Sequence, residues 1–188
     1  MTNFRIGLTG SGSSGKSSLA VELSKALEIP FVSSVSRSVF EARGLKESDQ
    51  HNLTPVERFS LQKDIFAAYR SNLWTYITDG NGFVADRTAI DHMCYMLYRC
   101  NDIITQADIE SIEEFTRFNL SQFDLIVFCP SGVVPLIDDG FREVKIGYQY
   151  LMDIAMRGLL EKMNKTYITA PLGSLEWRVD YIKNYLEQ

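Results

Sequence analysis

A stretch of eight residues near the N-terminus, residues 10–17, constrains the fold of this chain more than any other feature. It reads GSGSSGKS and fits the pattern G-x-x-x-x-G-K-[ST]. The apolar residues 4–9 precede it, and residues 16–27, with leucines and alanines at helical spacing, follow it. A glycine-rich turn between a strand and a helix is the setting in which this pattern forms a phosphate-binding loop (P-loop).

The residue types in this loop explain how it would hold phosphate. Glycines allow positive φ and a close backbone approach, so that successive N–H groups point inward as a nest for an anion. The helix that begins at Lys16 adds the positive end of its dipole. We expect Lys16 to reach the β- and γ-phosphates of ATP and the Ser17 hydroxyl to hold Mg²⁺. The predicted ATP-binding residues here are Gly10, Ser11, Gly12, Ser13, Ser14, Gly15, Lys16, Ser17 and Ser18.

Strand-like and helix-like segments alternate along the rest of the chain, which predicts an α/β fold with a parallel sheet between two layers of helices. The further predicted strands are 31–33, 83–86, 124–129 and 166–169. The further predicted helices are 36–43, 55–77, 89–99, one after Thr105, one ending near Asn164 and one capped by Ser174. The 188 residues contain no linker or repeat, so we expect a single domain over residues 1–188.

Composition excludes several classes of protein. Hydrophobic residues make up 45% and charged residues 23%, which is typical of a globular domain. The net charge of -5 argues against a broad basic surface for nucleic acid. Cys94, Cys100 and Cys129 form no CxxC pair, so we expect buried reduced thiols rather than a zinc site. With no signal-peptide pattern at the start, we expect a cytoplasmic protein, of a bacterium or a phage-infected cell.

Two charged residues, Asp86 and Arg87, follow the apolar run 83–85. Ligands of open α/β sheets bind at the carboxyl ends of strands, so both side chains should face the same crevice as the P-loop. Asp86 would act as general base on an acceptor hydroxyl or would hold Mg²⁺ through water. Arg87 would neutralise phosphate charge. Asp91 is at capping-box spacing from Thr88, so helix capping and acceptor binding remain equal alternatives for it.

Three further positions are candidates for the site. Arg37 follows the second predicted strand closely and would contact the acceptor. Arg142 lies in a long loop after the fourth strand, and the neighbouring Gly140 would serve as the hinge of a short lid over residues 132–146. Gly173 would bring backbone against adenine, or would form an ordinary turn into the last helix.

Two other features favour a structural interpretation. The helix over residues 55–77 has an aromatic stripe at helical spacing, which is more often part of a core than a platform for stacking bases. Its members are Phe59, Phe66, Tyr69, Leu73 and Trp74. His92 has no evident partner on its helix, so we expect a structural role for it as well.

The chain resembles the P-loop nucleoside and nucleotide kinases. It is similar to the AAA-type group that includes the ribosylnicotinamide kinase domain of NadR and many phage proteins. The resemblance rests on residues 6–17, on Asp86-Arg87-Thr88 with Asp91, and on residues 139–142. It implies a five-stranded parallel sheet in the order 2-3-1-4-5 and catalytic roles for Lys16, Asp86, Arg87 and Arg142. Ser36 precedes Arg37 where related kinases often have an acidic residue.

The leading interpretation is therefore an ATP- and Mg²⁺-dependent kinase that acts on a nucleoside or a (deoxy)nucleoside monophosphate, with a homodimer as one option for its assembly. A second interpretation is a kinase for a modified base or an end in DNA, against which the net charge of -5 argues. A third is a nucleotide-dependent switch or assembly ATPase. The sequence offers no candidate for the separate catalytic glutamate or the partner-reaching arginine of such proteins.

Overall fold

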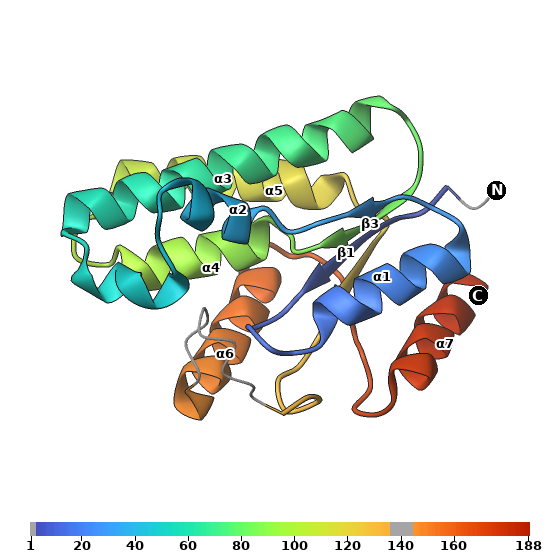
Figure 1. The fold of residues 1–188 in the computed structure, drawn as a ribbon. Helices are drawn as coiled ribbons and strands as arrows, with labels where there is room; N and C mark the ends of the chain where they lie inside the picture. Colours follow the sequence, from blue (N-terminus) through green and yellow to red (C-terminus); the bar gives the residue numbers. More distant parts are fainter. Residues whose placement is uncertain (1–2, 136–144) are drawn as a thin grey trace.

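A five-stranded parallel sheet forms the centre of the protein (Figure 1). The computed structural model describes residues 3–135 and 145–188. The strands are β1 (Arg5–Thr9), β2 (Phe31–Val32), β3 (Phe83–Asp86), β4 (Leu125–Phe128) and β5 (Ile168–Thr169). Their order is β2-β3-β1-β4-β5 and every pair is parallel, which confirms the predicted topology.

The helices lie where the sequence predicts them, within a few residues. They are α1 (Lys16–Leu27), α2 (Ser36–Ala42), α3 (Pro55–Thr78), α4 (Ala89–Arg99), α5 (Gln106–Ser121), α6 (Ile146–Lys162) and α7 (Leu175–Leu186). The start signals are confirmed at α3, α5 and α7, where Thr54, Thr105 and Ser174 each accept a hydrogen bond from a backbone N–H of the first turn. A 3₁₀ segment, η1 (Glu47–Asn52), was not predicted, because its sequence is polar and lacks apolar periodicity.

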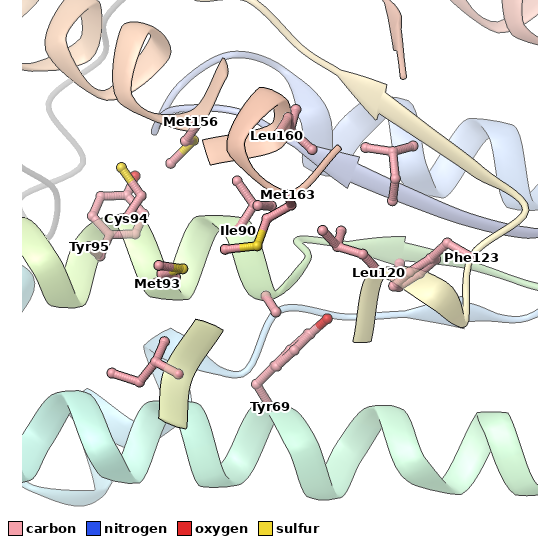
Figure 2. Packing of buried hydrophobic residues seen from close by; sticks show 14 of the residues in the cluster. Tyr69, Ile90, Met93, Cys94, Tyr95, Leu120, Phe123, Met156, Leu160 and Met163 are labelled. Atoms are coloured by element: carbon pink, nitrogen blue, oxygen red, sulfur yellow. The ribbon is translucent and has the colours of Figure 1, made fainter. Parts of the chain in front are cut away.

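Alternation along the strands divides the core into two layers. Leu8 and Val127 pack with α1 and α7 on one face of the sheet. Ala85, Ile126 and Phe128 face the other side, where the core is built with α3, α4, α5 and α6. Figure 2 shows this second layer, with Met93 of α4 and Leu160 of α6 among its members.

The aromatic stripe of α3 belongs mostly to the core. Tyr69 and Leu73 are buried, and the Tyr69 hydroxyl donates to Asn119 Oδ1 of α5 at 3.0 Å. Trp74 is the exception, because half of its surface is exposed. The three cysteines are free and buried, as predicted. Among the described residues, no helix is long and apolar enough to cross a membrane.

Candidate functional site

The P-loop connects β1 to α1 through a backbone path that needs glycine. Gly10 and Gly15 have φ of 153° and 74°. A Cβ at Gly10 would lie 2.2 Å from the carbonyl oxygen of Cys129, so no side chain fits there. Ser13 also has a positive φ, 59°. Left-handed residues alternating with right-handed ones turn successive N–H groups to one side, which is the geometry of an anion-binding nest.

The side chains of the loop point inward with few partners. Lys16 is 4% exposed, and its Nζ donates to the carbonyl oxygen of Ser11 at 2.8 Å. The hydroxyls of Ser11 and Ser14 are buried and have no hydrogen-bond partner in the described part of the chain. Burial lowers the pKa of Lys16, and the nearby positive charge of Arg87 lowers it further. The negative charge of a phosphate group in the loop would oppose this lowering of the Lys16 pKa. The phosphate would also give the Ser11 and Ser14 hydroxyls a hydrogen-bond partner.

Ser17, the first-turn hydroxyl of α1, is hydrogen-bonded to Asp86 at the end of β3. Its Oγ donates to Asp86 Oδ2 at 2.6 Å. Leu8 and Asp86 are paired in the register of β1 and β3, which explains why the P-loop and the Asp86–Arg87 pair meet. Asp86 is 7% exposed, and its Oδ1 is buried with no partner among the described residues.

This pair of oxygen groups fits Mg²⁺. Mg²⁺ is usually bound by one or two protein oxygens, with phosphates and water completing an octahedron. The Ser17 hydroxyl and the unpartnered Asp86 Oδ1 match that description. The described residues contain no group of three or more His, Cys, Asp or Glu that could hold a metal ion. The ion would therefore depend on the phosphates of the nucleotide.

Asp91 caps α4 and braces the P-loop. It is fully buried, and its carboxylate accepts from the backbone N–H of Thr88 at 2.9 Å and from that of Gly10 at 3.3 Å. The capping box with Thr88 that the sequence indicated is present. Burial raises the pKa of Asp91, and Lys16 opposes that shift. The capping alternative for Asp91 is therefore confirmed, and acceptor binding by this residue stays a prediction.

Arg87 has an unusual backbone. Its φ is 102°, which is rare for a residue with a side chain and costs about 1–3 kcal/mol. The guanidinium lies 5.3 Å from the centre of the Tyr95 ring, and that of Arg99 lies 4.8 Å from the same ring. Arg99 also forms an ion pair with Glu47. These contacts hold two cationic groups beside one ring of α4.

A cavity of about 250 Å³ adjoins the P-loop at Ser17 and Asp86. Its walls come from α1, α2, η1, α3, α4 and the loops after β2 and β3. The residues that line it are Ser17, Ser33, Ser34, Ser36, Arg37, Phe40, Glu47, Gln62, Ile65, Asp86, Arg87, His92, Tyr95 and Arg99. Three arginines and two acidic residues make it a polar pocket with an apolar wall at Phe40 and Ile65.

The structure brings most of the predicted residues together. Arg37, Asp86 and Arg87 all line this cavity, next to Ser17 of the P-loop. Gly173 lies beside the ring of Trp177, where a Cβ would come within 2.2 Å of a ring atom. The observed position of the Trp177 ring leaves no room for a side chain at residue 173, and adenine binding there stays a prediction. Arg142 and the central part of the lid, residues 136–144, lie outside the described residues.

Some residues that line the cavity were not identified from the sequence as candidates for the site. His92, Tyr95 and Arg99 lie on one face of α4, three and four positions apart, and this spacing after Arg87 was the available signal. His92 is buried and its Nε2 has no partner in the described part of the chain, although we expected only a structural role. Burial lowers the pKa of His92 well below its ordinary value, and Arg87 and then Lys16 lower it further. The imidazole is therefore neutral.

Comparison with solved structures confirms the fold. Deoxyadenosine kinase from M. mycoides with dCMP and dCDP bound matches with a TM-score of 0.70 and 18% identity, over 97% of this chain and 98% of that chain. Thymidylate kinase from Candida albicans matches with a TM-score of 0.65 and 16% identity, over 98% and 91%. NadR in complex with NR matches with a TM-score of 0.64 and 18% identity, over 99% of this chain but only 52% of NadR.

Comparison with curated proteins gave no match. A family model described as "AAA domain" matches residues 5–178, which include the P-loop, the Asp86–Arg87 pair and the walls of the cavity. The resemblance to P-loop nucleoside and nucleotide kinases of the NadR type, expected from the sequence motifs, is thereby confirmed at the level of fold and family. The chain belongs to this AAA domain family and has the fold of the P-loop kinases.

Proposed function

We propose that this protein transfers the γ-phosphoryl group of ATP to a nucleoside or a nucleoside monophosphate. The observation that carries the proposal is the shared wall between the P-loop and the cavity. Ser17 of the P-loop and its hydrogen-bond partner Asp86 both line the cavity, so an acceptor in the cavity would face the end of a triphosphate in the loop. A phosphate nest that opens directly onto a second polar pocket suits transfer between two bound molecules.

Each task that phosphoryl transfer requires has a candidate residue in this arrangement. Lys16 binds the β- and γ-phosphates and offsets the charge that develops between them. Bound Mg²⁺, held through Ser17 and Asp86, would neutralise phosphate charge. Arg87 faces the transferring group from the acceptor side, where its planar guanidinium binds phosphate oxygens. Asp86 Oδ1, which has no partner in the described structure, accepts the proton of the acceptor hydroxyl or holds the metal through water.

The lining of the cavity and the structural neighbours both support this acceptor class. Arg37 and Arg87 offer guanidinium groups to an anionic acceptor, whereas Arg99 is paired with Glu47, and Tyr95 and Phe40 supply aromatic surface. The neighbouring structures include a deoxyadenosine kinase with dCMP and dCDP bound and a thymidylate kinase. We further propose that Arg142 acts from a lid over residues 132–146 and that Gly173 lies near adenine.

A substrate screen tests this proposal. The protein is incubated with ATP, Mg²⁺ and single nucleosides or nucleoside monophosphates, and the products are analysed by mass spectrometry. We expect a mass gain of one phosphoryl group on at least one acceptor, and none when ATP is omitted. Phosphorylation of DNA ends without any small acceptor would instead favour a DNA kinase. ATP hydrolysis at the same rate with every addition would favour a switch or an assembly ATPase.

A further inference from the structure

One buried charge, Arg178 of α7, has no part in the site described so far. The side chain is 1% exposed, and among the described residues it is the bulkiest of those that are fully buried. Its Nε and Nη2 are buried and have no hydrogen-bond partner in residues 3–135 and 145–188. A buried guanidinium without an anion is costly, because desolvation of the charge is not repaid.

Among the residues that the structure describes, no anionic side chain is paired with Arg178. The Cys129 thiol, one residue after β4, interacts electrostatically with Arg178, and burial raises the pKa of that thiol to about 12. The thiol is therefore neutral at physiological pH. A methionine or leucine would fill the same volume at lower cost.

Arg178 reaches the P-loop from the side opposite the cavity. A Cβ at Gly15 would lie 2.9 Å from its Nη1, so the guanidinium lies directly against the start of α1. Helix α7 packs beside α1 on one face of the sheet, whereas α3 and α4, which wall the cavity, lie on the other (Figure 1). Arg178 does not line the cavity. Arg178 therefore lies on the side of the P-loop where the donor nucleotide would bind under the proposed function.

We propose that Arg178 binds the α-phosphate of the donor nucleotide. In a loop of this kind Lys16 reaches the β- and γ-phosphates, and backbone N–H groups cradle the α- and β-phosphates. The α-phosphate therefore lies nearest the first turn of α1, where the guanidinium meets Gly15. The bound phosphate supplies the missing anion and accepts from Nη1 and, after a small rotation, from Nη2. The inference depends on the proposed nucleotide binding and adds a donor-side residue to it.

Binding measurements with substituted proteins test the inference. Arg178→Met keeps most of the volume and removes the charge, Arg178→Lys keeps a point charge, and Arg70→Met on the exposed face of α3 is the matched control. Calorimetric titrations with ATP·Mg²⁺ and with ADP·Mg²⁺ are compared with the parent protein. We expect Arg178→Met to bind both nucleotides about 10- to 100-fold more weakly, by the usual value of a charge-assisted hydrogen bond. Arg178→Lys should be intermediate, and Arg70→Met should match the parent.

Thermal melting without nucleotide supplies the second measurement. Arg178→Met should melt at or above the temperature of the parent, since it removes an unpaired buried charge. Parental affinity for both nucleotides in Arg178→Met would overturn the inference, and a lower melting temperature with parental affinity would mark Arg178 as structural. Weaker ATP binding with unchanged ADP binding would place the contact at the γ-phosphate and would contradict the assignment of Arg178 to the α-phosphate.

If Arg178→Met does not fold, Arg178→Lys takes its place, and parental nucleotide affinity in Arg178→Lys would contradict the inference. A parent protein that binds neither nucleotide would instead refute the proposed function.

Discussion

The hydrogen bond from Ser17 to Asp86 joins the two halves of the proposed site at the scale of single residues. Ser17 belongs to the P-loop and Asp86 is the last residue of β3, and their oxygens are 2.6 Å apart. Both were predicted from sequence, because a strand that ends in a carboxylate beside a P-loop has little freedom in where it directs that group. Arg178, which lies against Gly15 of the P-loop, was not predicted, since a lone arginine in a helix carries no pattern.

Asp86→Asn separates the two roles of this carboxylate. The substitution keeps the shape and removes the negative charge. If Asp86 is the base, ATP·Mg²⁺ should bind almost normally and the transfer rate should fall roughly 100-fold or more. If Asp86 mainly supports the metal, the affinity for Mg²⁺ should fall and added Mg²⁺ should restore part of the rate. An unchanged rate with unchanged Mg²⁺ dependence would remove Asp86 from the active site.

Lys16→Ala tests the P-loop itself. We expect transfer to fall about 100-fold or more, the scale for losing one preorganised group that stabilises the transition state. The protein should still fold, with a melting temperature near that of the parent, because burial already disfavours the charge of Lys16 in the nucleotide-free protein. Turnover and thermal melting measure the two effects. Near-normal turnover in the folded variant would contradict the assignment.

At the scale of elements, α4 links the fold to the site. Its first turn braces the P-loop through Asp91, and its inner face supplies His92, Tyr95 and Arg99 to the cavity. The sequence predicted the bounds of α4 and its cap, because capping boxes and apolar periodicity are local signals. The contributions of η1 and α3, such as Glu47 and Gln62, could not be predicted, because they depend on how distant segments pack.

Asp91→Ala tests whether the cap supports nucleotide binding. We expect a loss of about 1–3 kcal/mol in the free energy of unfolding, because buried N–H groups of Thr88 and Gly10 lose their acceptor. Nucleotide affinity should also decrease, since Gly10 begins the P-loop. Denaturant unfolding and nucleotide titration measure both. Asp108→Ala, in the exposed capping box of α5, is the control and should leave nucleotide affinity unchanged. Equal effects of the two substitutions would argue against the bracing role.

The lid proposal also belongs to the element scale. Hydrogen exchange over residues 132–146 should slow when a bisubstrate analogue saturates the protein, because lid closure shields backbone amides. Arg142→Lys should reduce the transfer rate, since a point charge does not replace a planar guanidinium fork. Arg70→Lys, remote from the site, serves as its control. Unchanged exchange at saturation would argue against a lid in this segment.

At the scale of the whole molecule, the parallel sheet separates two functions. Helices α1 and α7 lie on the face where we place the donor nucleotide, and the acceptor cavity is walled by α2, α3 and α4 (Figure 1). The two sites meet at the carboxyl ends of β1 and β3, which neighbour each other in the strand order. This arrangement predicts that phosphoryl transfer occurs only when ATP and the acceptor are both bound.

Release of ADP from ATP, measured with and without acceptor, tests this account most directly. The parent protein is supplied with ATP and Mg²⁺, first alone and then with the acceptor that the mass-spectrometric screen identifies. Without acceptor, we predict slow ADP release. With acceptor, ADP release should be much faster, and one mole of phosphorylated acceptor should form for each additional mole of ADP. ADP release at the same rate in both conditions, with no phosphorylated acceptor, would contradict the kinase assignment.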